Sequence, residues 1–134
     1  MRIARALLED IVAHARADAP DECCGMVSAR GGAAVRVHRA ANAAASPLRY
    51  EIDSREQYRI QREIEDAGLG LGAIYHSHTR SAPQPSQTDI NLAFWPDALY
   101  VIVGVAGEEP EVRAFRIHDR RTFEEVALQV DEEA

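Results

Sequence analysis

The stretch Ala73–Asp89, AIYHSHTRSAPQPSQTD, places two histidines one residue apart and follows them with a proline-containing loop. Its apolar beginning, which runs into His76 and His78, is typical of a β-strand. Successive strand side chains point to opposite faces, so the two histidines should share one face, close enough to hold one ion. Prolines stiffen the loop that leads to Ser86 and Asp89. The stretch predicts a strand, a loop and a helix start, with polar side chains where they meet.

His76, His78 and Asp89 are candidate ligands of one zinc ion. Two imidazoles and one carboxylate leave one position of a tetrahedral zinc open for water, as in catalytic zinc sites. Such a zinc lowers the pKa of water to about 7. Simpler explanations remain open for the histidine pair and for the Ser86–Asp89 pair when each is taken alone. A His-x-His pair also occurs as ordinary polar residues at a strand end, and Ser86 with Asp89 has the S-x-x-D spacing of a helix N-terminus.

A hydrolase of this kind also needs a general base, and the candidate is Glu22 in the segment PDECCGMV. A carboxylate just before an apolar strand can lie at the sheet edge facing the metal. There it can accept a proton from water and pass it to the leaving amine. Taken alone, Glu22 is more often a solvated loop acid. Only the presence of the histidines favours the catalytic interpretation.

The rest of the chain alternates helical and strand periods and contains no repeats. The pattern predicts an α/β fold, a mixed sheet flanked by about three helices in a single domain spanning residues 1–134. A first helix carries Ile3, Leu7 and Ile11 and ends before Pro20. The second helix starts at Ser54 in a capping box with Gln57 and runs to about Gly68, and the third covers 85–95. Strands are expected at 24–30, 33–39, 69–78, 99–105, 111–117 and 122–130.

Composition sets limits on the class of protein. The chain has 134 residues, 46% hydrophobic and 28% charged, which fits an ordinary globular domain. No apolar run reaches the roughly 18 residues of a membrane helix, and the charged N-terminus does not resemble a secretory signal, so we expect a cytoplasmic protein. A net charge of −7 argues against nucleic acid as a partner.

The two cysteines, Cys23 and Cys24, are adjacent in the chain. A disulfide between neighbours strains the geometry that the bond requires, so both are expected to be reduced and buried. A cysteine hydrolase using one of them is an alternative function. Nothing in the sequence places a base and an orienting residue beside either thiol.

The candidate residues together resemble the JAMM (MPN+) metalloprotease motif, E…H-x-H-x(7)-S-x(2)-D. Every motif position and spacing matches, at Glu22, His76, His78, Ser86 and Asp89. The resemblance implies that the two histidines and the aspartate bind one Zn²⁺ per chain. It also implies that the glutamate is the general base and that the serine donates a hydrogen bond to the developing oxyanion.

The resemblance extends to P-x-E-x-x-G at Pro20–Gly25 and N-x-x-x-S-P-x-x-Y at Asn42–Tyr50. The chain is similar to short bacterial members that cleave adducts from the carboxyl end of ubiquitin-like sulfur-carrier proteins. The implied partner is such a carrier with a C-terminal Gly-Gly tail, and the implied fold is like that of cytidine deaminases. Many members have proline after the second histidine. Thr79 stands there in this chain, which bears on substrate preference.

Relatives of this fold that lack the metal ligands serve as assembly modules, so a non-catalytic scaffold is the other alternative function. The intact set of five motif residues argues against that role. The deaminase signature H-x-E with P-C-x-x-C and the zincin signature H-E-x-x-H are both absent from the sequence. The identity of the carrier and of the leaving group cannot be derived from these patterns.

Overall fold

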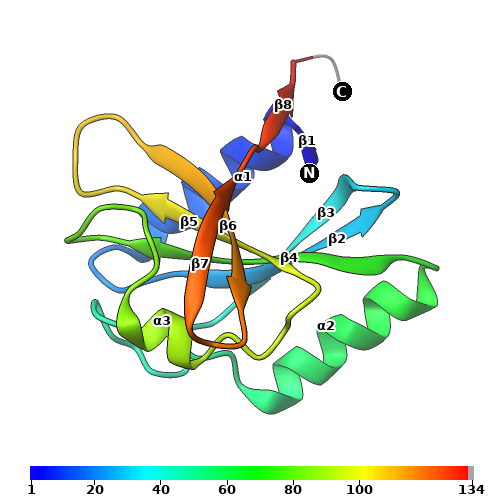
Figure 1. Ribbon diagram of the computed structural model, residues 1–134, viewed down its shortest axis with the longest axis horizontal. Coiled ribbons are helices and arrows are strands. Elements are labelled where there is room, and N and C mark those ends of the chain that lie inside the picture. Colours follow the sequence, from blue (N-terminus) through cyan, green and yellow to red (C-terminus); the bar gives the residue numbers. More distant parts are fainter. Residues whose placement is uncertain (133–134) are drawn as a thin grey trace.

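A computed structural model describes residues 1–132 of the chain, and it has a mixed eight-stranded sheet with three helices (Figure 1). This confirms the predicted α/β class. In chain order the elements are β1 (Arg2–Ala4), α1 (Arg5–Asp18), β2 (Cys24–Arg30), β3 (Ala33–Ala40), α2 (Ser54–Asp66), β4 (Gly70–His78), α3 (Gln87–Asn91), β5 (Leu99–Gly104), β6 (Glu111–His118), β7 (Thr122–Val126) and β8 (Gln129–Asp131). The strand order across the sheet is β7-β6-β5-β4-β2-β3-β1-β8.

The sheet is strongly curled. β7 and β8 lie at its opposite edges, yet only residues 127–128 separate them in the chain. Three Cα–Cα steps join Val126 to Gln129 and span at most about 11 Å, so the two edges have to approach each other. Figure 1 shows the chain passing directly from β7 into β8 beside β1.

Two apolar cores lie on the two faces of the sheet. On one face, α1 contributes Leu8 and Ile11 to a core that also holds Tyr75 of β4. On the other face, α2 contributes Ile60 and Ile64 to a second core. Side chains point alternately to the two faces along β4. Tyr75 points to the α1 face, so His76 and His78 lie on the α2 face. The central strand β5 is buried along its whole length, as its continuous apolar sequence predicts.

Two predictions about helix starts were wrong. Ile3 belongs to β1 rather than to the first helix, because its backbone lies beside Val130 of β8 in a parallel pair. The second helix is capped by Asp53 rather than by Ser54. The Asp53 carboxylate accepts hydrogen bonds from the backbone N–H groups of Arg55 and Glu56. This leaves Ser54 as the first helical residue.

The third helix is shorter than the predicted 85–95, since α3 covers only Gln87–Asn91. The N–H of Trp95 donates to the Tyr100 hydroxyl at 3.0 Å instead of continuing a helical ladder. Trp95 also precedes Pro96, and that position disfavours helical backbone. The predicted strand 122–130 is likewise divided into β7 and β8. Within residues 1–132, no helix is long and apolar enough to cross a membrane.

Candidate metal centre

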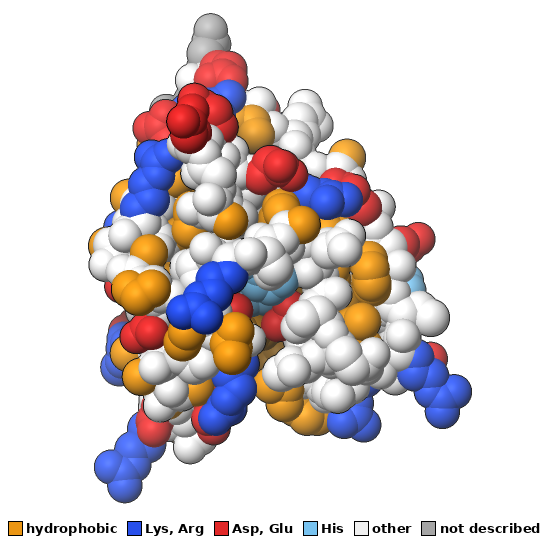
Figure 2. Space-filling view, turned by 90° about the vertical axis from the view of Figure 1, so that its left-hand side faces the viewer, with side chains coloured by type: hydrophobic (Ala, Val, Ile, Leu, Met, Phe, Trp, Pro, Cys, Tyr) orange, Lys and Arg blue, Asp and Glu red, His pale blue; other side chains and the backbone are white. Residues whose placement is uncertain are grey.

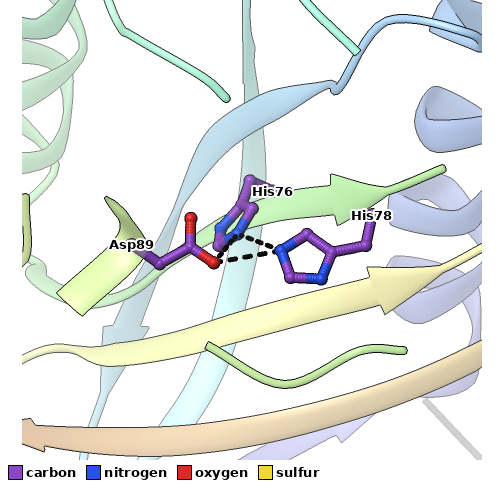
Figure 3. A group of neighbouring side chains, drawn as sticks. All are labelled: His76, His78 and Asp89. Atoms are coloured by element: carbon purple, nitrogen blue, oxygen red, sulfur yellow. Dashed lines mark hydrogen bonds and ion pairs between the residues drawn. The ribbon is translucent and has the colours of Figure 1, made fainter. Parts of the chain in front are cut away.

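Three side chains from β4 and α3 converge on one point, as Figure 3 shows. The Nε2 atoms of His76 and His78 are 3.3 Å apart. Oδ2 of Asp89 lies 3.1 Å from Nε2 of His76 and 3.0 Å from Nε2 of His78. All three side chains are almost completely buried. The structure thus brings together the three residues that the sequence proposes as ligands.

These distances fit a tetrahedral metal ion. With metal–ligand bonds of roughly 2.0–2.1 Å, two ligand atoms of a tetrahedron lie about 3.3 Å apart. The three separations of 3.0, 3.1 and 3.3 Å are close to that edge length. The donor set, two imidazoles and one carboxylate, is one that zinc prefers. The residues present therefore fit a zinc ion that keeps an open position.

The His78 ring is oriented by a backbone contact. Its Nδ1 lies 2.8 Å from the carbonyl oxygen of Ala82, so Nδ1–H donates there and Nε2 faces the cluster. Metal-binding histidines commonly donate their second ring N–H to such a carbonyl. Burial alone would lower the pKa of His78, but hydrogen bonds to Asp89 and Ala82 raise it. One positive charge, carried by a proton or a metal ion, is stabilised between these atoms.

Asp89 is held by the first turn of α3. Burial would raise the pKa of its carboxyl, but hydrogen bonds with His76 and His78 keep that pKa well below its usual range. The backbone N–H of Ser86 also donates to Oδ2 at 2.9 Å. The carboxylate therefore stays ionised at neutral pH and points at the histidines.

His76 is the most deeply placed member of the cluster. Burial lowers its pKa, which favours the neutral imidazole that binds a metal. The Tyr50 ring stacks on it, with ring centroids 4.4 Å apart and planes 19° from parallel. Its Nδ1 atom is buried without a hydrogen-bond partner among the described residues. The ring is thus held by the contact of Nε2 with Asp89 and by packing against Tyr50, without a hydrogen bond at Nδ1.

Glu22 lies two residues before β2, the strand that pairs with β4, which carries the histidines. Cys24 of β2 pairs with His76 of β4, and the N–H of Ser77 donates to the Cys23 carbonyl. Continuing this antiparallel register by one more residue places Glu22 opposite His78. Its side chain is 4% exposed, and Oε1 has no partner within the described part of the chain. Burial raises the pKa of Glu22 to about 7, partly offset by the nearby charge of His78.

Ser86 is exposed and forms the N-cap of α3. Its Oγ accepts the backbone N–H of Asp89 at 3.1 Å, while its own N–H donates to the Asp89 carboxylate. The helix-cap explanation of the Ser86–Asp89 spacing is therefore correct. It does not compete with a role at a metal centre, since the cap orients Asp89 and uses only the acceptor side of the hydroxyl.

The cysteines are buried and reduced, as predicted. Burial raises the pKa values of Cys23 and Cys24 to about 12, so neither is a thiolate at neutral pH. A nucleophilic cysteine needs the opposite shift. This disfavours the cysteine-hydrolase alternative.

Figure 2 shows a face of the protein on which histidine is visible at the bottom of a hollow, with acidic side chains beside it. A cavity of about 560 Å³ lies next to Tyr50 on the same side of the sheet and is lined mainly by apolar residues, among them Met26, Ile74 and Trp95. Phe94, 60% exposed, stands at its rim.

Sequence reasoning assigned no role to two residues that contact the site. Tyr50 packs on His76, and the Asn42 side chain donates to the carbonyl of Glu22 at 3.0 Å. Both belong to the N-x-x-x-S-P-x-x-Y motif, so the sequence motif contained the two residues without showing what they contact. The local sequence does not show which residues such a loop contacts.

Known proteins resemble the chain over most of its length. Residues 4–118 match the family of prokaryotic homologs of the JAB domain. The chain is 43% identical over 122 residues to the "CysO-cysteine peptidase" of Mycobacterium tuberculosis, covering 89% of this chain and 84% of the relative. It is 38% identical over 129 residues to the "Probable TtuB-protein conjugate cleaving protease" of Thermus thermophilus, covering 96% and 81%.

Solved structures share the fold. Protein DSY2949 from Desulfitobacterium hafniense superposes with a TM-score of 0.88 at 29% identity, covering 99% of this chain and 94% of that one. AF2198, a JAB1/MPN domain protein from Archaeoglobus fulgidus, gives 0.66 at 22% identity, with 98% and 97% covered. The matched family model and the shared fold agree with the motif residues, and the chain belongs to the JAB (JAMM/MPN+) family.

Proposed function

We propose that this protein is a zinc peptidase that hydrolyses conjugates of a ubiquitin-like protein. The observation that carries the proposal is the convergence of three ligand atoms, from His76, His78 and Asp89, within 3.3 Å of one another. A buried carboxylate, Glu22, lies just before the neighbouring strand β2. A non-catalytic scaffold has no need for either feature, so both support an enzyme.

In this proposal His76, His78 and Asp89 hold one zinc ion. When bound, zinc supplies Lewis-acid chemistry, in that it polarises a carbonyl and makes water more acidic. The ordered contacts around the ligands, from Tyr50 to His76 and from Ala82 to His78, keep the rings in place. Such outer contacts affect metal affinity by about 10–100-fold.

Glu22 is the proposed general base and acid. A carboxyl group with a pKa of about 7 exchanges protons readily at neutral pH. Its Oε1 is buried without a partner among residues 1–132, so it is available to accept a proton from water and to return it to the leaving amine. We expect Glu22→Gln to keep its metal and to lose about 10²–10⁴-fold in kcat.

Ser86 is the proposed oxyanion donor. Its oxygen accepts one hydrogen bond from the Asp89 N–H, which leaves the hydroxyl proton free to donate elsewhere. The hydroxyl is exposed at the start of α3, next to the ligand Asp89. A hydrogen-bond donor there stabilises negative charge that develops on the substrate carbonyl.

The proposed substrate is an adduct in which the C-terminal glycine of a sulfur-carrier protein is bound to cysteine or another amine. The two relatives above are named for cleaving a CysO–cysteine bond and TtuB–protein conjugates. A Gly-Gly tail has no side chains and can enter the narrow hollow over the histidines. The apolar cavity beside Tyr50 is a suitable place for the larger tail residues that precede the glycines.

The experiment offers the zinc-loaded protein several carrier adducts, with cysteine, with other amino acids and with a protein lysine. Mass spectrometry identifies the released amine and the new carrier carboxyl end. We expect cleavage directly after the terminal glycine, and cleavage about 10²–10⁴-fold slower with Glu22→Gln. If the wild-type protein leaves every adduct intact while binding zinc normally, the proposed activity is wrong.

A further inference from the structure

In the loop formed by residues 41–53, between β3 and α2, one side chain makes several hydrogen bonds to the backbone. The Asn42 amide makes four contacts of 2.9–3.0 Å, two as donor and two as acceptor. Nδ2 donates to the carbonyls of Glu22 and Arg49, and Oδ1 accepts the N–H groups of Ala44 and Glu51. A fifth, longer contact of 3.5 Å joins Nδ2 to the Ser46 carbonyl.

This loop also holds the backbone of Glu22. Glu22 lies outside the strands, since β2 begins only at Cys24. Its N–H donates to the Ser46 carbonyl at 2.9 Å, and its carbonyl accepts from Asn42 at 3.0 Å. Both backbone groups of the proposed base are therefore bound by the loop and not by the sheet ladder.

The next residue is held in a different way. The N–H of Cys23 donates to the Ser77 hydroxyl at 2.8 Å, and the N–H of Ser77 donates to the Cys23 carbonyl. Cys23 is thus fixed to β4, the strand of the histidines, while Glu22 is fixed to the loop. The position of the Glu22 carboxylate relative to the metal ligands depends on both attachments.

We propose that Asn42 is a positioning residue, which acts on the reaction by holding Glu22 at its place beside the metal centre. The inference rests on the proposed function, in which Glu22 is the base. Only an amide supplies two donors and two acceptors at this point. Aspartate would keep the acceptor contacts to Ala44 and Glu51 but would lose both donors and would face the carbonyl of Glu22 with a negative charge.

The first test compares Asn42→Ala and Asn42→Asp with Asn91→Ala, which removes the chain's other asparagine from an exposed place on α3. We expect both Asn42 variants to bind about one zinc per chain, to keep KM within about threefold and to lose about 10–100-fold in kcat, because small misplacements of a catalytic group have effects of this size. The Asn91 variant should match the wild type. Unchanged kcat in both Asn42 variants would overturn the proposal.

The second test asks whether Asn42 acts through Glu22. In a Glu22→Gln background, adding Asn42→Ala should lower kcat by less than about threefold, because the group it positions is already inactive. A full additional loss of 10–100-fold would show that Asn42 acts on something else. A residue that merely stabilises the fold gives the additive result.

The third test does not use activity. Amide hydrogen exchange, measured by NMR on the zinc-loaded protein, should become on the order of tenfold faster at Glu22 in both Asn42 variants. At Glu51 it should become faster in Asn42→Ala only, since aspartate keeps that acceptor. If Glu22→Gln alone retains full kcat, the base assignment fails, but this exchange result still decides whether Asn42 holds Glu22. Unchanged exchange at Glu22 overturns the positioning role.

Discussion

Replacing Ser86 separates its two roles, because the helix cap and the proposed oxyanion donor use different parts of one hydroxyl. The cap uses the oxygen, which accepts the Asp89 N–H at 3.1 Å. Alanine removes this bond, and loss of an N-cap costs about 1 kcal/mol of stability. For a chain of 134 residues this lowers Tm by roughly 4 °C. The reciprocal bond, from the Ser86 backbone to Asp89, survives, so the metal should stay.

Catalysis should respond much more strongly than stability. Removal of one oxyanion donor lowers kcat by about 10²–10³-fold, or roughly 3–4 kcal/mol, with substrate Kd nearly unchanged. Ser86→Gly provides the matched control, because glycine at an N-cap costs only a few tenths of a kcal/mol. It should keep Tm within about 2 °C and lose as much kcat as alanine. Ser86→Thr retains a hydroxyl and should recover most of the activity.

The assay measures kcat, substrate Kd and Tm for the three variants on one carrier–amino acid adduct. The reasoning is refuted if alanine and glycine both keep kcat within about threefold of the wild type while alanine alone lowers Tm. Ser86 would then be a cap with no part in the chemistry.

Two further predictions concern stability. For metal-free protein, burial raises the pKa of Glu22 to about 7 from a usual value near 4.3, so the folded state holds a proton that the unfolded chain releases. Stability should fall as pH rises from about 4.5 to 7, by about 1–3 kcal/mol once water near the carboxylate is allowed for, and Glu22→Gln should lack this loss. Urea unfolding of the wild type and of Glu22→Gln at several pH values measures this loss. A difference in unfolding free energy between the two proteins that does not change with pH would contradict the prediction. Gly25→Ala should cost about 1–3 kcal/mol, because its Cβ would lie 2.4–2.5 Å from atoms of the buried Tyr75 ring. Gly70→Ala, whose Cβ has no neighbour nearer than 4.0 Å, is the control, and equal losses in the two variants would contradict the packing argument.

Local patterns were sufficient for the parts of the fold that depend on neighbouring residues. Alternation along β4 placed His76 and His78 on one face, and the S-x-x-D spacing located the start of α3. Asp53 took the capping role expected of Ser54 because two adjacent residues both suit an N-cap, and only backbone geometry decides between them.

Long-range pairing explains what the patterns missed. Ile3 has helical spacing with Leu7 and Ile11, but its backbone pairs with Val130, far along the chain. The pairing of β2 with β4 similarly determines that Glu22 lies beside His78. The spacing of apolar residues within one segment does not show which distant residues pair with it. The contacts of Asn42 and Tyr50 with the site depend on the same tertiary arrangement.

The metal content of the purified protein tests the central claim most directly. Inductively coupled plasma mass spectrometry should find about one zinc per chain in the wild type and close to none in His76→Ala or Asp89→Asn. His118→Ala, which removes an exposed histidine at the end of β6, should keep its zinc. Chelation should abolish cleavage of a carrier adduct, and added zinc should restore it. A wild-type protein that cleaves the adduct fully without any transition metal, or a His76→Ala protein that retains zinc, would contradict the account.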